Sequence, residues 1–474
     1  MSPPRVLVIG AGFAGVECLH RLERTLRPEE AEPVLVSPED YQLYLPLLPH
    51  VAAGLLTPQS IAVSLRRRLR RTRYAPGIAV GVDHERRHVT VRTPEGHERA
   101  LRYDILLLAA GSTTRPLGIP GVREHALGIP GVREHALGIP GVREHALGMK
   151  TLAQAAYLRD HVIGQLDAAA VATDPAERAE RLRFLVVGGG YAGTETAASL
   201  QLLTSAAVRR FPRLDPAELS WHLVDIAPRL LPEIGERLGD DALRALRARG
   251  IEISLGTSVA RLTPRSVELT DGRVLPTRTL VWTAGVAASP LMTTVETELA
   301  RGRLVTTAEM AVPGAPGVFA VGDAAAVPDL AKGGDAVTPP TAQHSQRQGK
   351  AVAYNIAARL RGTAPRPYHR DLGLVVDLGD KYAVSGPLGI GLTGLPAQAV
   401  ARGYHLAALP TLTARARVLV NWTLKAATGD DFVSTGFQRG RPATLPQFEH
   451  AELYGGGGAN AAPPEPDAAP PEPE

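Results

Sequence analysis

Two segments of this chain, residues 5–22 and 183–200, follow one pattern, and this repetition constrains the fold more than any other feature. The first reads RVLVIGAGFAGVECLHRL and the second RFLVVGGGYAGTETAASL. Each has a short apolar run rich in β-branched residues, then a glycine cluster, then apolar residues at helical spacing. A strand that is apolar at every position is typical of a parallel sheet covered on both faces. We therefore expect an α/β protein with two Rossmann-like dinucleotide-binding domains.

Short apolar runs elsewhere predict the remaining strands of these sheets. They occupy residues 33–36, 103–109, 221–224, 279–282 and 317–321. Three runs end in small residues, where a bulky side chain would block a ligand at the carboxyl edge of a parallel sheet. Those ends are Ala110-Gly111-Ser112, Ala284-Gly285 and Gly322-Asp323. We expect Ala110, Gly111, Ala284 and Gly285 to contact bound cofactors.

The first glycine cluster is a G-x-G-x-x-G motif formed by Gly10, Gly12 and Gly15. The first glycine permits a tight turn, the second lets main-chain N–H groups approach a pyrophosphate, and the third lets the helix pack on the strand. A phosphate bound there also meets the positive end of the helix. Phe13 and Ala14 lie inside the motif and are expected to contact the same cofactor.

The acidic residue that normally follows such a motif, about 20 positions further on, is missing at its usual place. Ser37 ends the second strand instead, and Glu39 stands two residues beyond it. A hydroxyl can donate or accept one hydrogen bond. We therefore count Ser37 as a candidate contact to the adenosine ribose.

The second glycine cluster repeats the motif with Gly188, Gly190 and Gly193, and Tyr191 lies inside it. Here the next strand does end in an acid, Asp225. A carboxylate at this position binds a free ribose 2′-hydroxyl and repels a 2′-phosphate, so NADH is expected in preference to NADPH.

Two observations leave the role of Asp225 open. Arg229 is close enough in sequence to offset the repulsion of a 2′-phosphate. An ordinary solvated carboxylate at a strand end would also show the same sequence.

Gly322 and Asp323 follow the last apolar run, and a helix is expected to begin there. An aspartate at a helix start can accept hydrogen bonds from main-chain N–H groups or from a ribityl hydroxyl of a flavin. A plain helix N-cap would look the same. Gly322 and Asp323 are candidate flavin-binding residues.

In this order, these motifs resemble the flavoprotein reductases with two dinucleotide-binding domains. Within that group the chain resembles the type II NADH dehydrogenases, the single-chain NADH:quinone oxidoreductases that pump no protons. The resemblance spans roughly residues 5–360. It rests on YQLYLPLLPHVAAGLLTPQSIA at 41–62, GYAGTETA at 190–197, VWTAGV at 281–286 and PPTAQHSQRQGKAVAYNI at 339–356.

The resemblance implies FAD in the first domain, whose sheet is split by the inserted NADH-binding domain. The residues it assigns to FAD are Gly10, Gly12, Gly15, Ala110 and Asp323, and those it assigns to NADH are Gly190, Gly193, Glu195 and Asp225. Glu195 is expected near the nicotinamide, where it would relay a proton or position the ring, and an inert helix carboxylate is the alternative. Gln343 is expected beside the flavin in the quinone pocket.

The chain departs from that family at two positions near the expected acceptor. Arg347 replaces a glutamine of the pattern A-Q-x-A-x-Q-Q-G, and Gln42 stands where a histidine is common. Both leave the identity of the acceptor open, with menaquinone and ubiquinone as the leading candidates. Because a flavin itself carries out the hydride chemistry, the protein is expected to orient the substrates and exclude water.

The motifs divide the chain into six parts. They are the first part of an FAD-binding domain (1–116), a tandem-repeat loop (117–150), an NADH-binding domain (151–286), the second part of the FAD-binding domain (287–365), a small C-terminal region with potential for membrane-surface attachment (366–450), and a disordered tail (451–474). The loop contains LGIPGVREHA three times without change, at 117–126, 127–136 and 137–146. Surface insertions cost little loop-closure entropy, so extra copies are expected to be neutral.

Composition excludes several classes of protein. A formal net charge of +4 excludes a strongly cationic nucleic-acid binder but leaves an anionic membrane surface open. The single cysteine, Cys18, excludes a disulfide framework, a thiolate zinc site and the cysteine pair of a sulfide:quinone oxidoreductase. No metal site is expected.

Localisation is expected to be cytoplasmic, free or peripheral on the inner face of the cell membrane. The first predicted strand begins at Arg5, which leaves no room for a signal peptide, and no run approaches the ~18 apolar residues of a membrane span. The basic run SLRRRLRRTR at 64–73 could face solvent or anionic lipid. The segment 411–426 predicts a helix that either lies at a membrane surface or docks on the protein.

The leading interpretation is an FAD-dependent NADH:quinone oxidoreductase, and two alternatives remain open. One is a soluble NAD(P)H reductase with a protein or small-molecule acceptor, such as a ferredoxin reductase. The other is a non-catalytic redox sensor that binds both dinucleotides. A homodimer is compatible with the sequence.

Overall fold

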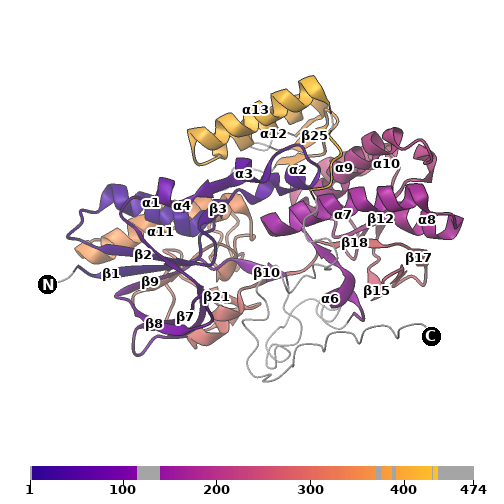
Figure 1. Ribbon diagram of the computed structural model, residues 1–474. Helices are drawn as coiled ribbons and strands as arrows, with labels where there is room; N and C mark the ends of the chain where they lie inside the picture. Colours follow the sequence, from indigo (N-terminus) through magenta and orange to yellow (C-terminus); the bar gives the residue numbers. More distant parts are fainter. Residues whose placement is uncertain (1–2, 115–138, 370–374, 387–390, 430, 436–474) are drawn as a thin grey trace, which may run out of the picture.

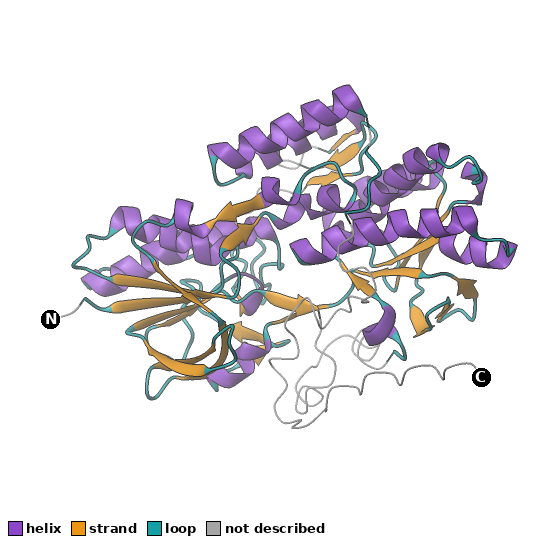
Figure 2. Ribbon diagram, viewed as in Figure 1, coloured by secondary structure: helices purple, strands orange, loops and turns teal. Residues whose placement is uncertain are grey.

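The computed structural model describes residues 3–114, 139–369, 375–386, 391–429 and 431–435. Two parallel sheets each have helices against them, and the last two helices lie across the region where the two halves meet (Figures 1 and 2). The expected α/β class with two Rossmann-like sheets is confirmed. The first two copies of the ten-residue repeat and the tail at 451–474 lie outside the described residues.

The first sheet has five parallel strands in the order β22-β9-β1-β2-β5. Helices α1 (Phe13–Thr25) and α11 (Ala342–Arg361) pack together against one face, and a three-stranded antiparallel sheet packs on the other. The five strands are β1 (Arg5–Ile9), β2 (Glu32–Ser37), β5 (Arg73–Pro76), β9 (Ile105–Leu108) and β22 (Val318–Ala320), and the antiparallel strands are β6 (Ile78–Asp83), β7 (His88–Arg92) and β8 (Glu98–Arg102).

The second sheet also has five parallel strands, in the order β11-β18-β12-β13-β14. Its helices include α7 (Leu152–Val171), α8 (Pro175–Leu182), α9 (Tyr191–Ala207) and α10 (Glu236–Ala248). The strands are β11 (Leu147–Gly148), β12 (Arg183–Val187), β13 (Ser220–Asp225), β14 (Ile251–Leu255) and β18 (Thr279–Trp282). Between β14 and β18 the chain forms a separate antiparallel sheet of β15 (Val259–Leu262), β16 (Ser266–Leu269) and β17 (Val274–Pro276). All five apolar runs predicted as strands are strands; the run at 279–282 matches β18 at both ends, and the other four have ends shifted by one or two residues.

The chain passes between the two halves twice. It leaves the first sheet after β9, completes the second sheet, and returns to add β22 beside β9. The outgoing β10 (Ser112–Thr114) pairs antiparallel with the returning β19 (Val286–Ala288), between the two sheets in Figure 1. This order of strands is that of a domain interrupted by an inserted one, and the boundaries between the six parts stay a prediction.

The C-terminal region covers the junction of the two halves. A small sheet of β24 (Val375–Asp377), β25 (Ala383–Ser385) and β26 (Leu392–Thr393) precedes α12 (Gly394–Ala408) and α13 (Leu412–Thr428). Buried residues of this region share one hydrophobic cluster with the second half and with residues 44–63, which include α2 (Leu48–Ala52) and α3 (Pro58–Ile61). Segments from three parts of the sequence therefore meet beneath α12 and α13.

The remaining short elements lie in the connections. They are β3 (Tyr41–Leu43), β4 (Ala62–Ser64), α4 (Leu65–Arg68), α6 (Val142–His145), β20 (Leu299–Ala300), β21 (Arg303–Val305), β23 (Ala325–Ala326), and the single turns η1 (Leu45–Leu47), η2 (Val208–Arg210), η3 (Pro216–Glu218), η4 (Pro232–Ile234), η5 (Pro290–Val295) and η6 (Gly322–Ala324).

Candidate functional site

The first glycine turn connects β1 to α1 and has the shape that a pyrophosphate requires. Gly10 has φ +105°, and a Cβ there would overlap the carbonyl oxygen of Ala109. A Cβ on Gly15 would overlap the carbonyl oxygen of Gly10, so this glycine allows the helix to pack on the turn. Gly12 is the N-cap of α1 and faces open space, with no side chain bonded to the N–H groups of the first turn. Those N–H groups and the open space in front of them fit a dinucleotide phosphate.

The second glycine turn, between β12 and α9, repeats this geometry. Gly188 has φ +117°, and a Cβ there would lie 2.5 Å from Oγ1 of Thr283. A Cβ on Gly193 would overlap the carbonyl oxygen of Gly188, whereas Gly190 faces open space as the N-cap of α9. Tyr191 begins the helix. The residues of both turns thus fit the same kind of ligand.

Asp225 lies where β13 ends, directly beside the second turn. Its carboxylate accepts hydrogen bonds from the main-chain N–H of Gly189 and, at 2.6 Å, from that of Ala227. Arg229 instead pairs with Glu236 at 2.8 Å. Asp225 therefore lies beside the second glycine turn, and the guanidinium of Arg229 is paired with Glu236.

Asp323 follows β22, at the same edge of the first sheet as the first glycine turn. The helix expected there is wrong: η6 is a single 3-10 turn, and the chain continues as β23, which pairs with β21. The Asp323 carboxylate accepts from the hydroxyl of Ser112 at 2.7 Å, and Lys150 Nζ lies 3.2 Å from that hydroxyl. Sequence reasoning did not single out Ser112 or Lys150 as site residues.

Gln348 connects the turn after β22 to α11. Its side-chain oxygen accepts from the N–H of Gly322 at 2.7 Å, and its amide donates to Oγ1 of Thr338 at 2.9 Å. Gly322 itself has φ +67°, which suits glycine. The turn after β22 is thereby tied to α11 instead of propagating as a helix.

The other small residues at the strand ends lie at the same edges of the two sheets. Ser37 ends β2, is buried, and accepts from the N–H of Glu39 at 3.3 Å. Gly111 and Gly285 both have positive φ, +68° and +72°. Ala110 precedes the outgoing link between the sheets, and Ala284 precedes the returning one, where its carbonyl accepts from Trp282 Nε1 at 2.6 Å.

Glu195 lies in the first turns of α9, and its side chain is buried beneath the C-terminal region. Its Oε1 accepts from the main-chain N–H of Asp377 in β24 at 3.0 Å. Burial raises the pKa of Glu195 well above its ordinary value; the hydrogen bond from Asp377 lowers that pKa and the Asp377 charge raises it. Burial therefore favours the protonated carboxyl.

Tyr44 links the first glycine turn to the region around Glu195. Its ring packs edge-on against Phe13 with centroids 5.6 Å apart, and its hydroxyl lies 3.1 Å from Nδ1 of His405 in α12. Burial, then the charges of Tyr404 and Glu195, raise the pKa of Tyr44. Burial lowers the pKa of His405 to about 4. None of these tyrosine and histidine contacts was predicted from the sequence.

Gln343 and Arg347 lie one turn apart on α11. Arg347 Nη2 donates to Gln343 Oε1 at 3.1 Å, and Nη1 is buried with no hydrogen-bond partner in the described part of the chain. The charge of Arg347 lowers the pKa of Tyr404, whose burial has the larger, opposite effect. Gln42, the other departure from the family pattern, is buried with Oε1 also unpartnered among the described residues.

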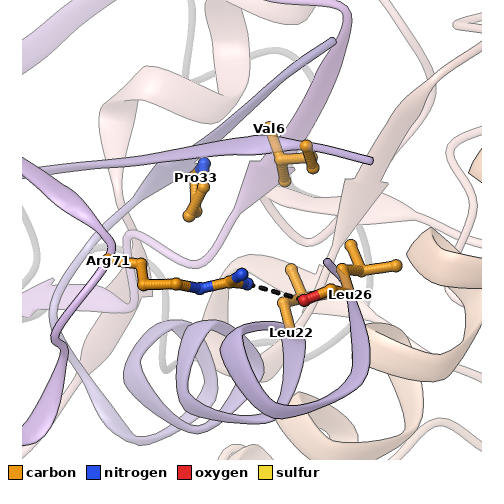
Figure 3. A pocket seen from close by; sticks show the side chains of 6 residues that line it. Val6, Leu22, Leu26, Pro33 and Arg71 are labelled. Carbon is orange, nitrogen blue, oxygen red and sulfur yellow. Dashed lines mark hydrogen bonds between the residues drawn. The ribbon is translucent and has the colours of Figure 1, made fainter. Parts of the chain in front are cut away.

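A small pocket elsewhere belongs to the packing of the first sheet (Figure 3). It lies at the amino-terminal ends of β1 and β2, opposite the edge that carries the glycine turn. The Arg71 guanidinium borders it and donates to the carbonyl of Leu26 at 2.8 Å. Its lining residues are Val6, Leu22, Leu26, Ala31, Pro33 and Arg71.

The basic run at 64–73 is not a uniform solvated face. Arg68 is turned inward and pairs with Glu17 at 2.8 Å, whereas Arg66 and Arg67 are exposed. Among the described helices, none combines the length and apolarity needed to cross a bilayer. The described residues also contain no cluster of three or more histidine, cysteine or carboxylate side chains placed to hold a metal ion.

Comparisons with known proteins extend over most of the chain. Residues 4–349 match the pyridine nucleotide-disulphide oxidoreductase family. The chain is 30% identical to the type II NADH:quinone oxidoreductase Ndh of Mycobacterium tuberculosis over 443 aligned residues, and this alignment covers 89% of each protein. It is 27% identical to the type II NADH:quinone oxidoreductase of Staphylococcus aureus over 82% of this chain and 91% of that one. The structure of NDH2 from Plasmodium falciparum in complex with NADH has the same fold, with a TM-score of 0.79, 18% identity, and coverage of 91% and 99%.

Proposed function

This chain belongs to the pyridine nucleotide-disulphide oxidoreductase family and, within it, to the type II NADH:quinone oxidoreductases, and we propose how its residues carry out that reaction. The protein is an FAD-dependent enzyme that oxidises NADH and reduces a quinone without pumping protons. FAD held at the first glycine turn would supply the hydride-accepting and electron-donating chemistry of this reaction. The chain itself has to bind and orient the cofactor and substrates, exclude water from the site, and supply a proton.

The first glycine turn holds FAD in this proposal. The N–H groups after Gly12 bind the pyrophosphate, and Ser37 contacts the adenosine ribose. Asp323, held by Ser112, binds a ribityl hydroxyl. Ala110 and Gly111 leave room for the cofactor at the end of β9. The observation that supports this arrangement is the open, uncapped helix N-terminus at Gly12, which recurs at Gly190.

The second glycine turn holds NADH. The N–H groups after Gly190 bind its pyrophosphate, and Asp225 accepts from the 2′-hydroxyl of the ribose. Ala284 and Gly285 leave space for the nicotinamide end. Since Arg229 is paired with Glu236, a 2′-phosphate beside Asp225 would meet a carboxylate without a free cation, which favours NADH over NADPH.

Glu195 is the proposed proton carrier, and its position is the single observation on which the mechanism rests. The carboxyl is buried, favours its protonated form, and lies close enough to Tyr44 for its charge to raise the pKa of that tyrosine. Tyr44 in turn contacts Phe13 in the first glycine turn. Glu195 belongs to the helix that follows the second turn. A proton held there is available where the two nucleotide sites converge.

The quinone is proposed to bind beside the first turns of α11. Arg347 carries a buried N–H group without a partner in the described structure, and Gln343 is fixed by the other terminal nitrogen of Arg347. A quinone carbonyl that gains negative charge during reduction suits such a cationic donor. The quinone is proposed to be menaquinone or ubiquinone.

Attachment to an anionic membrane surface on the inner face of the cell membrane is also proposed. Helix α13 exposes Leu412, Leu419, Val420 and Leu424 on one side, and Val418 and Trp422 contact the protein on the other. Arg66 and Arg67 add exposed positive charge. Such a helix lies at the membrane–water interface and does not span the bilayer. A homodimer is compatible with this arrangement.

Steady-state oxidation of NADH by the FAD-loaded protein with a short-chain quinone tests the reaction. Quinone reduction that is stoichiometric with NADH oxidation is expected. Rapid bleaching of the flavin by NADH without quinone reduction would leave the soluble reductase with another acceptor as the better account. Tight binding of both dinucleotides with negligible turnover would leave the redox sensor.

A further inference from the structure

Four polar side chains that the mechanism above does not use lie together beneath the C-terminal helices. They are His50 from α2, Asp377 at the end of β24, Arg402 from α12 and Trp422 from α13, and we call them the Asp377 cluster. Asp377 Oδ2 lies 3.7 Å from Nε2 of His50 and 3.9 Å from Nε of Arg402. The Arg402 guanidinium stacks 5.2 Å from the centre of the Trp422 ring.

Each member of the cluster has a buried polar atom without a hydrogen-bond partner in the described part of the chain. These atoms are His50 Nδ1, Asp377 Oδ2, Arg402 Nε and Trp422 Nε1. Buried polar atoms in folded proteins are nearly always partnered, so four unpartnered atoms in one place make this cluster unusual among the described residues. Arg402 is partly exposed and opens the cluster to solvent.

The two oxygens of Asp377 have different surroundings. Oδ1 is fixed: it accepts from the main-chain N–H of Gly379 at 2.9 Å and from the amide of Gln398 at 3.5 Å. Oδ2 has no hydrogen-bond partner among the described residues; Nε2 of His50 and Nε of Arg402 lie beside it at distances too long for direct hydrogen bonds. The carboxylate is therefore anchored on one side and free to interact with a proton on the other.

Asp377 is also the residue that contacts Glu195. Its main-chain N–H donates to Glu195 Oε1 at 3.0 Å, and its charge raises the pKa of Glu195 beyond the effect of burial. Burial lowers the pKa of His50, and Arg402 lowers it further, whereas Asp377 raises it. His405 on α12 feels the charges of both His50 and Asp377. Changes in charge on Asp377 therefore reach Glu195 directly.

The reaction has one proton to be supplied from solvent. NADH loses a hydride from C4 of its nicotinamide, which carries two electrons and one hydrogen. The quinone gains two electrons and forms two O–H bonds. The overall reaction is NADH + H⁺ + quinone → NAD⁺ + quinol, so one hydrogen comes from NADH and one proton must enter from water.

We propose that Asp377 is a positioning residue that, held between His50 and Arg402, controls the proton occupancy of Glu195 and so the entry of the solvent proton that quinone reduction consumes. This inference rests on the proposed role of Glu195. Asp377 does not touch the quinone or the nucleotides in this account. It acts through the carboxyl that it contacts, and the partly exposed Arg402 marks the side from which the proton arrives.

Two substitutions with opposite electrostatic effects test the proposal. Asp377→Asn removes one negative charge but keeps both the main-chain N–H to Glu195 and an oxygen that can accept from Gly379. Glu195 then loses its proton at lower pH, so the fall in kcat for quinone reduction at high pH moves down by about one pH unit. Arg402→Gln removes the cation that compensates Asp377, so the same fall moves to higher pH.

Asp329→Asn is the matched control. Asp329 is similarly buried, accepts from an N–H two residues ahead, that of Ala331, and lies 3.9 Å from Lys332. Its replacement removes an equivalent charge away from Glu195 and should leave the pH profile unchanged. Asp377→Glu retains the charge and should restore the wild-type profile in part.

Two further readouts separate this role from a structural one. Reduction of ferricyanide takes electrons but no protons, so its pH profile should not move in either variant. Infrared titration of the oxidised enzyme, with the protonated carboxyl band assigned by its loss in Glu195→Gln, should show the band disappearing at lower pH in Asp377→Asn.

Opposite shifts of the quinone profile, with the control unchanged, support the proposal. Shifts in the same direction, no shift in either variant, or an infrared band that titrates as in the wild type would overturn it. If Asp377→Asn does not fold, Arg402→Gln decides alone: its quinone profile and its protonated carboxyl band should both move to higher pH, and no movement of either would overturn the proposal. Failure of the wild-type enzyme to reduce quinone would reject the proposed function itself, which is a distinguishable outcome.

Discussion

The hydroxyl of Tyr44 lies 3.1 Å from Nδ1 of His405, although 361 residues separate them in the sequence. Tyr44 follows β3 and packs against Phe13 of the first glycine turn, and His405 belongs to α12 of the C-terminal region. This contact connects the C-terminal region to the first glycine turn. The region also buries Glu195 through Asp377, so both contacts are needed for the proposed proton site.

Tyr44→Phe should affect both stability and quinone reduction. It leaves His405 Nδ1 buried without its partner, which should lower the free energy of unfolding by about 1–3 kcal/mol. Tyr103→Phe is the matched control, because that hydroxyl lies 3.1 Å from Nδ1 of His84 away from the site. Denaturant unfolding should show losses in both variants, and kcat for quinone should fall only in Tyr44→Phe. Equal kcat values in the two variants would contradict the role of Tyr44.

Substitutions in the first glycine turn should separate cofactor binding from folding. Gly12→Ala places a methyl group in open space, so the protein should fold but bind FAD at least about tenfold more weakly because the phosphate is displaced. Gly15→Ala would overlap the carbonyl oxygen of Gly10 and should lower the unfolding temperature instead. Flavin absorbance after gel filtration and thermal unfolding measure the two effects. A Gly12→Ala protein with unchanged FAD affinity would count against the pyrophosphate site.

Asp225→Ala should raise the Michaelis constant for NADH about tenfold, because the carboxylate no longer binds the 2′-hydroxyl. It should also reduce the ratio of kcat/KM for NADH to that for NADPH, because the carboxylate no longer repels a 2′-phosphate. Steady-state kinetics with both nucleotides measure this. Asp83→Ala, at the end of β6, is the control for loss of a strand-end carboxylate. An unchanged constant for NADH would remove Asp225 from the site.

Stability should fall as pH is lowered below neutrality. His405 is buried and neutral, with a folded-state pKa of about 4 below its ordinary unfolded value of about 6.5. The unfolded chain therefore binds the proton first, and the contribution present above about pH 6.5 is lost progressively toward pH 4. Its size is roughly 3 kcal/mol. Denaturant unfolding at several pH values should show this slope, and His405→Gln should flatten it; an equally steep slope in that variant would contradict the assignment.

Membrane attachment, if it uses α13, should depend on the exposed apolar side of that helix. Leu419→Glu should reduce cosedimentation with anionic vesicles several-fold, and added salt should weaken the wild-type interaction because exposed arginines contribute. Val274→Glu changes an exposed apolar residue on β17 in the second half and should have no effect. Equal losses in the two variants would place attachment elsewhere.

The glycine turns could be predicted from sequence because their geometry is local. Gly15 and Gly193 each face a carbonyl oxygen of their own motif, and Gly10 and Gly188 have positive φ, so these requirements are set within the motif itself. The predicted strands were confirmed because the apolar runs are short and rich in β-branched residues, which favours buried strands over helices. The roles assigned to individual site residues stay predictions.

The surroundings of Glu195 could not be predicted, because they depend on contacts between distant segments. Asp377 is 182 residues from Glu195, and no motif marks it or His50 as site residues. The helix expected after Asp323 was wrong for a similar reason. Gln348 of α11 takes the N–H of Gly322, and pairing of β23 with β21 draws the chain away from the helical path.

We propose above all that the two glycine turns hold FAD and NADH so that electrons pass from NADH to a quinone. An anaerobic titration tests it most directly: FAD-loaded protein receives one equivalent of NADH and then one equivalent of a short-chain quinone, with the flavin absorbance recorded throughout. The flavin absorbance should bleach completely on the first addition and recover fully on the second. A flavin absorbance that NADH leaves unchanged would contradict it.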